Sequence, residues 1–288
     1  MLCRVLIVDD DPLVLNALRR ELLRKPDIGA EGIEIEAFET GADALRRAAE
    51  PDGYFDVAIV DYRMRGMSGI EFFERLRVLQ PATARILITG RLDMNGAIAA
   101  INDARVDQLV TKPWGEYDLK GRIALALHQR ALTRSLPAGA APARTDRPFF
   151  LMLVDDEPAQ VKALERELSL HGRATQGPHA LFEILGVTSP ALALVEAAKR
   201  CPDIVIADYA MPEIDGIALL ARLRALCPGG VGILMSGKAN AHVLADAINL
   251  AGIYHFVPKP WDADVLRAVI AEALTHRELL RALNERGD

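Results

Sequence analysis

The chain has 288 residues, which is long enough for two domains that each bury a core of their own. It carries 34 Lys and Arg against 40 Asp and Glu, so its net charge of -6 argues against direct binding to nucleic acid. No apolar run reaches the ~18 residues that a membrane span needs, and the N-terminus does not resemble a signal peptide, so no membrane contact is expected.

The three cysteines of the chain, Cys3, Cys201 and Cys227, are widely spaced and form no Cys-x-x-Cys pair. An odd and scattered set argues against a disulfide framework and against a zinc site. The sequence therefore predicts three cysteines that pack in or near a core, in a reducing cytoplasm.

The first half of the chain alternates apolar runs, typical of buried parallel strands, with segments of helical periodicity. Pro12 follows the first run and suits the first turn of a helix. The apolar face of that helix is marked by Leu13, Leu15, Leu18, Leu22 and Leu23. The alternation predicts five β-α units, that is, an α/β domain in which helices cover both faces of a parallel sheet.

The second half repeats the first, motif by motif, and from the strand aspartate onward the spacings are equal. The matched pairs are Val8-Asp9-Asp10 with Val154-Asp155-Asp156, Val60-Asp61 with Ala207-Asp208, Thr89-Gly90 with Ser236-Gly237, and Lys112-Pro113-Trp114 with Lys259-Pro260-Trp261. A glycine, Gly69 or Gly216, follows each strand aspartate by the same interval. The sequence thus predicts a duplicated domain.

The predicted boundaries place the first domain at residues 1–134 and the second at 149–288. Residues 135–148 between them are rich in Pro, Ala and Gly without periodicity, as expected of an exposed linker. The second domain ends in a long predicted helix from about Asp262 to Leu283.

Parallel strands bring their carboxyl ends to one edge of the sheet, where open α/β sheets bind ligands. In the first copy this edge would carry Asp9, Asp10, Asp61, Thr89 and Lys112. Carboxylates that lie close together need a cation between them, and hard oxygen ligands suit Mg²⁺. A lysine and a hydroxyl can bind phosphoryl oxygens, and an ionised aspartate can attack phosphorus without a general base. The strand aspartate of each copy is therefore a candidate phosphoryl acceptor.

Each of these residues also has a plain structural interpretation. The adjacent acids could cap a helix, the hydroxyls could be turn residues, and the lysines could be surface charges. All of them occur twice at matched spacing, which favours a site.

With these motifs in place, both halves resemble the receiver domains of two-component response regulators. The resemblance implies two doubly wound, five-stranded flavodoxin-like domains in tandem. It also implies Mg²⁺-dependent transfer of a phosphoryl group from a histidine kinase or phosphotransfer protein to Asp61 and Asp208.

The resemblance further implies a role for each residue at the edge. The metal ligands would be Asp10, Asp61 and the carbonyl of Arg63 in the first copy, and Asp156, Asp208 and the carbonyl of Ala210 in the second. Asp9 and Asp155 would act through metal-bound water. Phosphoryl binding would fall to Thr89, Lys112, Ser236 and Lys259, with cis bonds at Lys112-Pro113 and Lys259-Pro260.

The first copy departs from the family pattern at two positions. Four residues after the acceptor it has Arg65, where the second copy has the usual Pro212. Arg65 is either a solvated loop residue or an element that alters phosphorylation rate or partner choice. At the family's switch position the second copy has the aromatic Phe256, which either switches or packs, and the first has Leu109, interpreted as packing. If only one acceptor drives output, we expect it to be Asp208.

The leading hypothesis is a tandem-receiver response regulator with no enzymatic activity beyond its own phosphorylation and dephosphorylation. Its output would run through contacts with a downstream protein effector or through a homodimer. One alternative is a scaffold or dimerisation module in which the first copy no longer switches. Another is the regulatory part of a longer effector, such as a cyclic-di-GMP hydrolase. A metal-dependent phosphohydrolase is disfavoured, because Arg63 and Ala210 stand where such enzymes carry a second acid.

Overall fold

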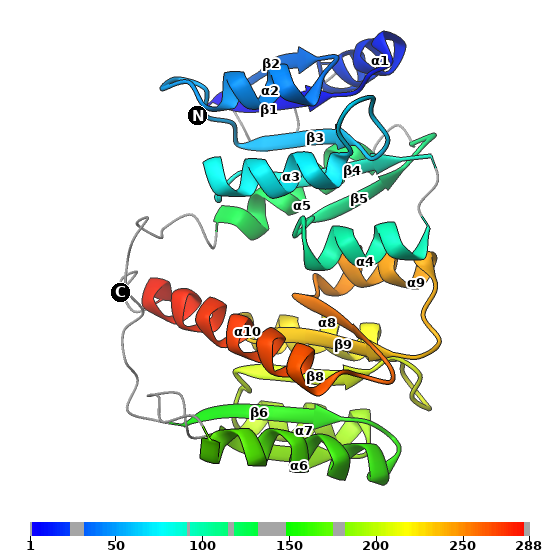
Figure 1. The fold of residues 1–288 in the computed structure, drawn as a ribbon, viewed down its shortest axis with the longest axis vertical. Helices are drawn as coiled ribbons and strands as arrows, with labels where there is room; N and C mark the ends of the chain where they lie inside the picture. Colours follow the sequence, from blue (N-terminus) through cyan, green and yellow to red (C-terminus); the bar gives the residue numbers. More distant parts are fainter. Residues whose placement is uncertain are drawn as a thin grey trace. The chain divides into compact units, whose positions relative to one another are not determined.

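The computed structural model describes residues 2–23, 32–90, 93–114, 118–131, 148–174 and 182–284. Contacts within the chain divide it into two compact units, Met1–Ser135 and Leu136–Asp288. In Figure 1 each unit is a sheet with helices on both sides. The predicted linker lies outside the described residues except for Pro148, so its boundaries stay a prediction.

The first unit is a five-stranded sheet in the order β2-β1-β3-β4-β5, and every pair of neighbouring strands is parallel. This order confirms the predicted doubly wound α/β fold. The elements are β1 (Leu2–Val8), α1 (Pro12–Leu23), β2 (Gly32–Phe38), α2 (Gly41–Ala48), β3 (Val57–Asp61), α3 (Gly69–Leu79), β4 (Ala84–Thr89), α4 (Met94–Asn102), β5 (Gln108–Thr111) and α5 (Asp118–Ala131).

The second unit repeats this topology, with neighbouring parallel strands in the order β7-β6-β8-β9-β10. Its elements are β6 (Phe149–Val154), α6 (Pro158–Ala174), β7 (Phe182–Val187), α7 (Pro190–Lys199), β8 (Ile204–Asp208), α8 (Gly216–Leu226), β9 (Val231–Ser236), α9 (Ala241–Asp246), the π-helical turn η1 (Ala247–Ala251), β10 (His255–Pro258) and α10 (Ala263–Asn284). The long terminal helix matches its predicted range to within a residue at each end. None of the helices in the described ranges has both the length and the apolarity to cross a membrane.

Each sheet has one core on either face. In the first unit α1 and α5 pack on one face and α2, α3 and α4 on the other. The prediction for α1 is correct for Leu15, Leu18 and Leu22, which are buried, and wrong for Leu13 and Leu23, which are exposed. The helical turn places those two residues outside the face of α1 that packs on the sheet, so apolar character alone did not identify the buried face.

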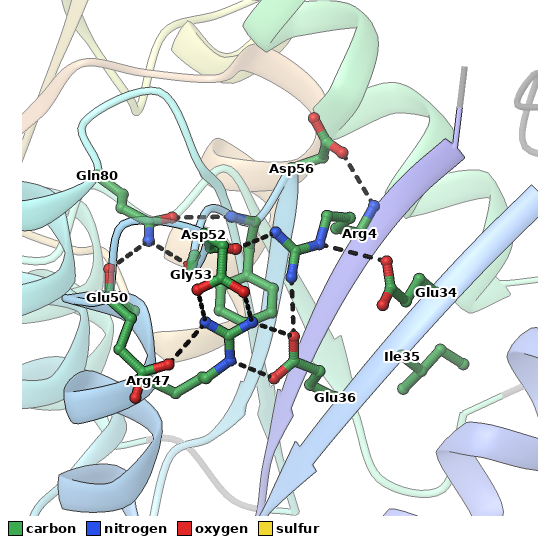
Figure 2. A network of polar contacts seen from close by, with 12 residues as sticks. Arg4, Glu34, Ile35, Glu36, Arg47, Glu50, Asp52, Gly53, Asp56 and Gln80 are labelled. Carbon is green, nitrogen blue, oxygen red and sulfur yellow. Dashed lines mark hydrogen bonds and ion pairs between the residues drawn. The ribbon is translucent and has the colours of Figure 1, made fainter.

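Figure 2 shows a polar network at the edge of the first sheet that is opposite the predicted site. Arg47 of α2 donates from Nε to Glu36 of β2 at 2.8 Å and pairs with Asp52 at 3.0 Å. Arg4 of β1 reaches the same Glu36 at 2.9 Å. The network joins two strands, a helix and a loop, so it supports the fold.

The C-terminal end of α3 is held by the buried side chain of Gln80, which also appears in Figure 2. Its Nε2 donates to the carbonyls of Ala48 and Gly53, each at 2.8 Å. Its Oε1 accepts from the backbone N–H of Phe55 and from the hydroxyl of Thr83, both at 3.0 Å. Three of these hydrogen bonds join the end of α3 to α2 and to the loop before β3, and the fourth holds the loop that leads into β4.

In the second unit a disulfide lies at the corresponding place, and the prediction of three unpaired cysteines is wrong. Cys201 and Cys227 are bonded, with their Cα atoms 5.5 Å apart and a sequence separation of 26. Cys201 follows α7, and Cys227 caps the C-terminal end of α8. Strand β8 leads away from this edge and α8 returns to it, so only the tertiary path brings the two together. Cys3 is buried in the core of the first unit, as predicted.

Candidate functional site

The predicted site residues of the first unit lie at the carboxyl ends of neighbouring strands. Asp9 follows β1, Asp61 is the last residue of β3, and Thr89 is the last residue of β4. Val8 is in register with Val60, and Thr89 with Thr111 at the end of β5, so these ends are level. The backbone N–H of Lys112 donates to the carbonyl of Thr89 at 2.8 Å, which holds the lysine beside the hydroxyl residue.

The centre of the site is a lysine between two buried aspartates. Lys112 Nζ lies 2.7 Å from Asp9 Oδ2 and 2.6 Å from Asp61 Oδ1. Asp9 and Asp61 are only 2% and 7% exposed. Because carboxylates this deeply buried repel one another, an opposite charge between them is required, and the ammonium provides it.

The second unit reproduces this arrangement. Lys259 Nζ lies 2.6 Å from Asp155 Oδ2 and 2.5 Å from Asp208 Oδ1. Ser236 ends β9 and is buried, and its backbone carbonyl accepts from the N–H of Lys259 at 3.0 Å. The bonds Lys112-Pro113 and Lys259-Pro260 are both cis, as the resemblance implied.

Burial and pairing act in opposite directions on the charges of this site. Burial raises the pKa of Asp9 by more than its hydrogen bonds from Lys112 and the backbone lower it. Burial also lowers the pKa of Lys112, but the hydrogen bonds to Asp61 and Asp9 and the negative charges of these two groups together outweigh it, and the net direction is upward. Asp155 and Lys259 are shifted in the same directions for the same reasons. Both lysines therefore stay cationic at neutral pH.

The second carboxylate oxygen of each strand aspartate is held by the backbone. The N–H of Arg63 donates to Asp61 Oδ2 at 2.7 Å, and the N–H of Ala210 donates to Asp208 Oδ2 at 2.7 Å. With Oδ1 on the lysine and Oδ2 on an amide, each carboxylate has one fixed orientation.

The donors at this edge suit Mg²⁺. The carboxylates of Asp10 and Asp61 and the carbonyl of Arg63 are hard oxygen ligands, and Asp156, Asp208 and Ala210 offer the same set. Among the described residues, no group of three or more His, Cys, Asp or Glu side chains could hold a metal ion by itself. Such a set nevertheless fits Mg²⁺, which commonly takes one or two carboxylates and completes its shell with water and phosphate oxygens.

The two residues at the predicted switch position are both buried. Leu109 and Phe256 lie in β5 and β10, in register with Leu87 and Leu234 of the neighbouring strands. They are 2% and 0% exposed. In this structure both pack in the core, and a switching role for Phe256 stays a prediction.

One contact of the site was not foreseen. Arg65 donates to Asp10 Oδ2 twice, from its backbone N–H at 3.2 Å and from Nε at 3.0 Å. The sequence signal for this contact was the arginine in a position where the repeat has proline, but its partner could not be identified from the sequence.

The sequence of both units matches one known protein family. The sequence model of the response regulator receiver domain matches the chain twice, at residues 5–124 and 151–271. The chain belongs to the receiver domain family. The two units are therefore called receiver 1 and receiver 2 below.

Individual relatives match part of the chain. It is 35% identical over 132 residues to the transcriptional regulatory protein KdpE of Mycobacterium tuberculosis. The match covers 46% of this chain and 54% of KdpE. It is 31% identical over 188 residues to a protein-glutamate methylesterase/protein-glutamine glutaminase of Carboxydothermus hydrogenoformans, covering 63% of this chain and 51% of that protein. The chain thus spans about half the length of these relatives.

Solved structures of receiver domains are also similar. A signal receiver domain of an HD domain-containing protein from Pseudomonas fluorescens is 30% identical, with a TM-score of 0.41. The match covers 46% of this chain and 98% of that one.

Proposed function

We propose that this tandem-receiver protein is a two-component response regulator that accepts phosphoryl groups on Asp61 and Asp208. The donor would be a histidine kinase or a phosphotransfer protein. The observation that carries the proposal is the buried strand aspartate of each receiver, which is fixed by a backbone amide and bridged by a lysine to a second acid.

The chemistry needs alignment more than proton transfer. A carboxylate oxygen of Asp61 attacks phosphorus, the new P–O bond forms as the P–N bond of a donor phosphohistidine breaks, and the imidazole leaves. Lys112 neutralises phosphoryl charge, and the hydroxyl of Thr89 donates to a phosphoryl oxygen. Mg²⁺, when held by Asp10, Asp61 and the carbonyl of Arg63, neutralises the remaining negative charge.

The proposed output runs through protein contacts with a downstream effector or through a homodimer, without direct nucleic acid binding. The role proposed is regulatory and not enzymatic. The scaffold alternative, in which receiver 1 no longer switches, is not favoured, because both halves match the receiver family and each keeps its set of site residues. A cytoplasmic location stays a prediction. The cysteine pattern no longer supports it, because Cys201 and Cys227 form a disulfide.

The test is phosphorylation of the full chain with acetyl phosphate and Mg²⁺, followed by intact mass. We expect two added phosphoryl groups in the wild type, one in each of Asp61→Asn and Asp208→Asn, and none in the double variant. Omitting Mg²⁺ should abolish labelling in all of them. Labelling of Asp208 alone would favour the scaffold alternative for receiver 1, and no labelling at either site would refute the proposal.

A further inference from the structure

The loop that follows the acceptor strand differs chemically between the two receivers. In receiver 1 the same oxygen of Asp10, Oδ2, accepts from both the backbone N–H and the guanidinium of Arg65. Asp10 is half-buried, whereas the side chain of Arg65 is 88% exposed. The guanidinium therefore reaches the acid from the solvent side of the site.

Receiver 2 cannot make either contact. The equivalent residue is Pro212, which has no N–H and no charge. The next residue of each loop, Gly66 or Glu213, has a positive φ, of 79° and 72° respectively, so the two backbones turn alike at this point. The two donors that Arg65 offers to Asp10 are therefore ones that Pro212 cannot offer to Asp156.

We propose that Arg65 is a built-in competitor for the divalent cation of receiver 1, so that receiver 1 requires more Mg²⁺ than it would with proline at this position. The inference rests on the proposed function, in which Asp10 is a metal ligand. A carboxylate oxygen that holds a guanidinium must release it, or share it, before it can coordinate a metal. A fixed positive charge beside the site also repels an incoming cation.

The size of the effect follows from the exposure of the pair. Ion pairs open to water contribute only ~0.2–1 kcal/mol, because solvent screens them and the long side chain loses entropy. Arg65 therefore does not block the site. Together with charge repulsion, it weakens Mg²⁺ binding about twofold to fivefold. At limiting Mg²⁺ the two acceptors would respond differently to the same phosphoryl donor.

The experiment is a Mg²⁺ titration of the full-length, ¹⁵N-labelled chain, observed by NMR. The amide of Arg63 reports receiver 1 and the amide of Ala210 reports receiver 2, because each donates to its acceptor carboxylate. In Arg65→Ala we expect Mg²⁺ to bind receiver 1 about twofold to fivefold more tightly, with receiver 2 unchanged. Arg65→Pro removes the backbone donor as well and should tighten binding at least as much. Pro212→Arg should weaken binding in receiver 2 only.

The matched control is Arg77→Ala, which removes the same charge from an exposed position in the last turn of α3. Equal affinities of receiver 1 in Arg65→Ala and Arg77→Ala would overturn the inference while leaving Mg²⁺ binding, and so the proposed function, intact. An absence of Mg²⁺-dependent shifts at both reporters would overturn the metal site itself. The Mg²⁺ concentration that half-saturates acetyl phosphate labelling of Asp61 should fall by the same factor in Arg65→Ala.

Discussion

Gly69 and Gly216 occupy the first position of the helix that follows each acceptor strand. A Cβ atom at Gly69 would lie 2.4 Å from the carbonyl oxygen of Asp61, and one at Gly216 would lie 2.2 Å from that of Asp208. The obstructing atom is backbone in both cases, so it cannot turn aside as a flexible side chain would. The helix therefore closes directly on the strand aspartate, and only glycine permits that approach.

Gly69→Ala should accordingly damage receiver 1 in two ways. We expect a loss of about 1–3 kcal/mol in its free energy of unfolding, because the added methyl group forces the backbone apart. Acetyl phosphate labelling of Asp61 should fall while labelling of Asp208 is unchanged. Urea denaturation followed by receiver 1 amide signals, together with intact mass, measures both.

Gly121→Ala in α5 is the matched control for this prediction. A Cβ there meets nothing within 4 Å, and the site is exposed on a helix. Alanine should leave the stability of receiver 1 equal or raise it by up to ~1 kcal/mol, because alanine favours helix. Equal urea midpoints for the two variants would show that the close approach at Gly69 has no energetic consequence.

At the scale of elements, the two receivers secure the same junction by different means. In receiver 1 the buried amide of Gln80 joins the end of α3 to the end of α2 and to the next loop. In receiver 2 the residue that caps the corresponding helix is Cys227, and it is bonded to Cys201. Both devices fix the helix ends at the edge opposite the acceptor, so the duplicated fold has kept the junction while its chemistry has changed.

Gln80→Ala should lower the free energy of unfolding of receiver 1 strongly, although it removes only a few side-chain atoms. The substitution leaves the N–H of Phe55 and the carbonyls of Ala48 and Gly53 without the partners they have now. Unsatisfied buried polar groups cost about 1–3 kcal/mol each, and water can reach some of them after the truncation, so we expect a loss of about 2–4 kcal/mol in receiver 1. Chemical denaturation monitored by receiver 1 signals is the measurement.

The control for Gln80 is Val78→Ala, two residues earlier on the exposed side of α3. Surface substitutions of this kind usually change the free energy of unfolding by less than ~0.5 kcal/mol. If Gln80→Ala were as mild as Val78→Ala, the hydrogen bonds of Gln80 would not be what holds the junction.

At the scale of the whole molecule, each of the two units has a core of its own on the face of its sheet that its first and last helices cover. One lies between the first sheet and α1 and α5, and another between the second sheet and α6 and α10. Each receiver buries its own apolar surface, so we expect two unfolding transitions and not a single cooperative one.

Reduction of the disulfide should move only one of these transitions. A covalent link across 26 residues limits the unfolded chain, and its loss costs at most about 3–4 kcal/mol. We expect dithiothreitol to lower the thermal midpoint of receiver 2 and to leave that of receiver 1 in place. Cys201→Ser should reproduce the shift and remove any further response to the reductant. A shift of receiver 1 alone would contradict this account.

The fold and the site residues could be read from the sequence because both depend on local patterns. Strand and helix periods, the repeat, and matched spacing gave the parallel sheets, and a parallel sheet collects its strand ends at one edge. That is why Asp61 and Lys112 could be expected to meet, and their 2.6 Å contact bears this out. Buried faces were less certain, since Leu13 and Leu23 are apolar and yet exposed.

The sequence by itself thus determined the two receiver domains and which residues stand at the carboxyl edge of each sheet, because these follow from order and spacing along the chain. Only the tertiary structure decided the Cys201–Cys227 disulfide, the close approach of Gly69 to Asp61, and the hydrogen bond from Arg65 to Asp10. Each of these depends on how elements distant in sequence return to the same place. A distance across the fold is set by packing and is not encoded in any local pattern.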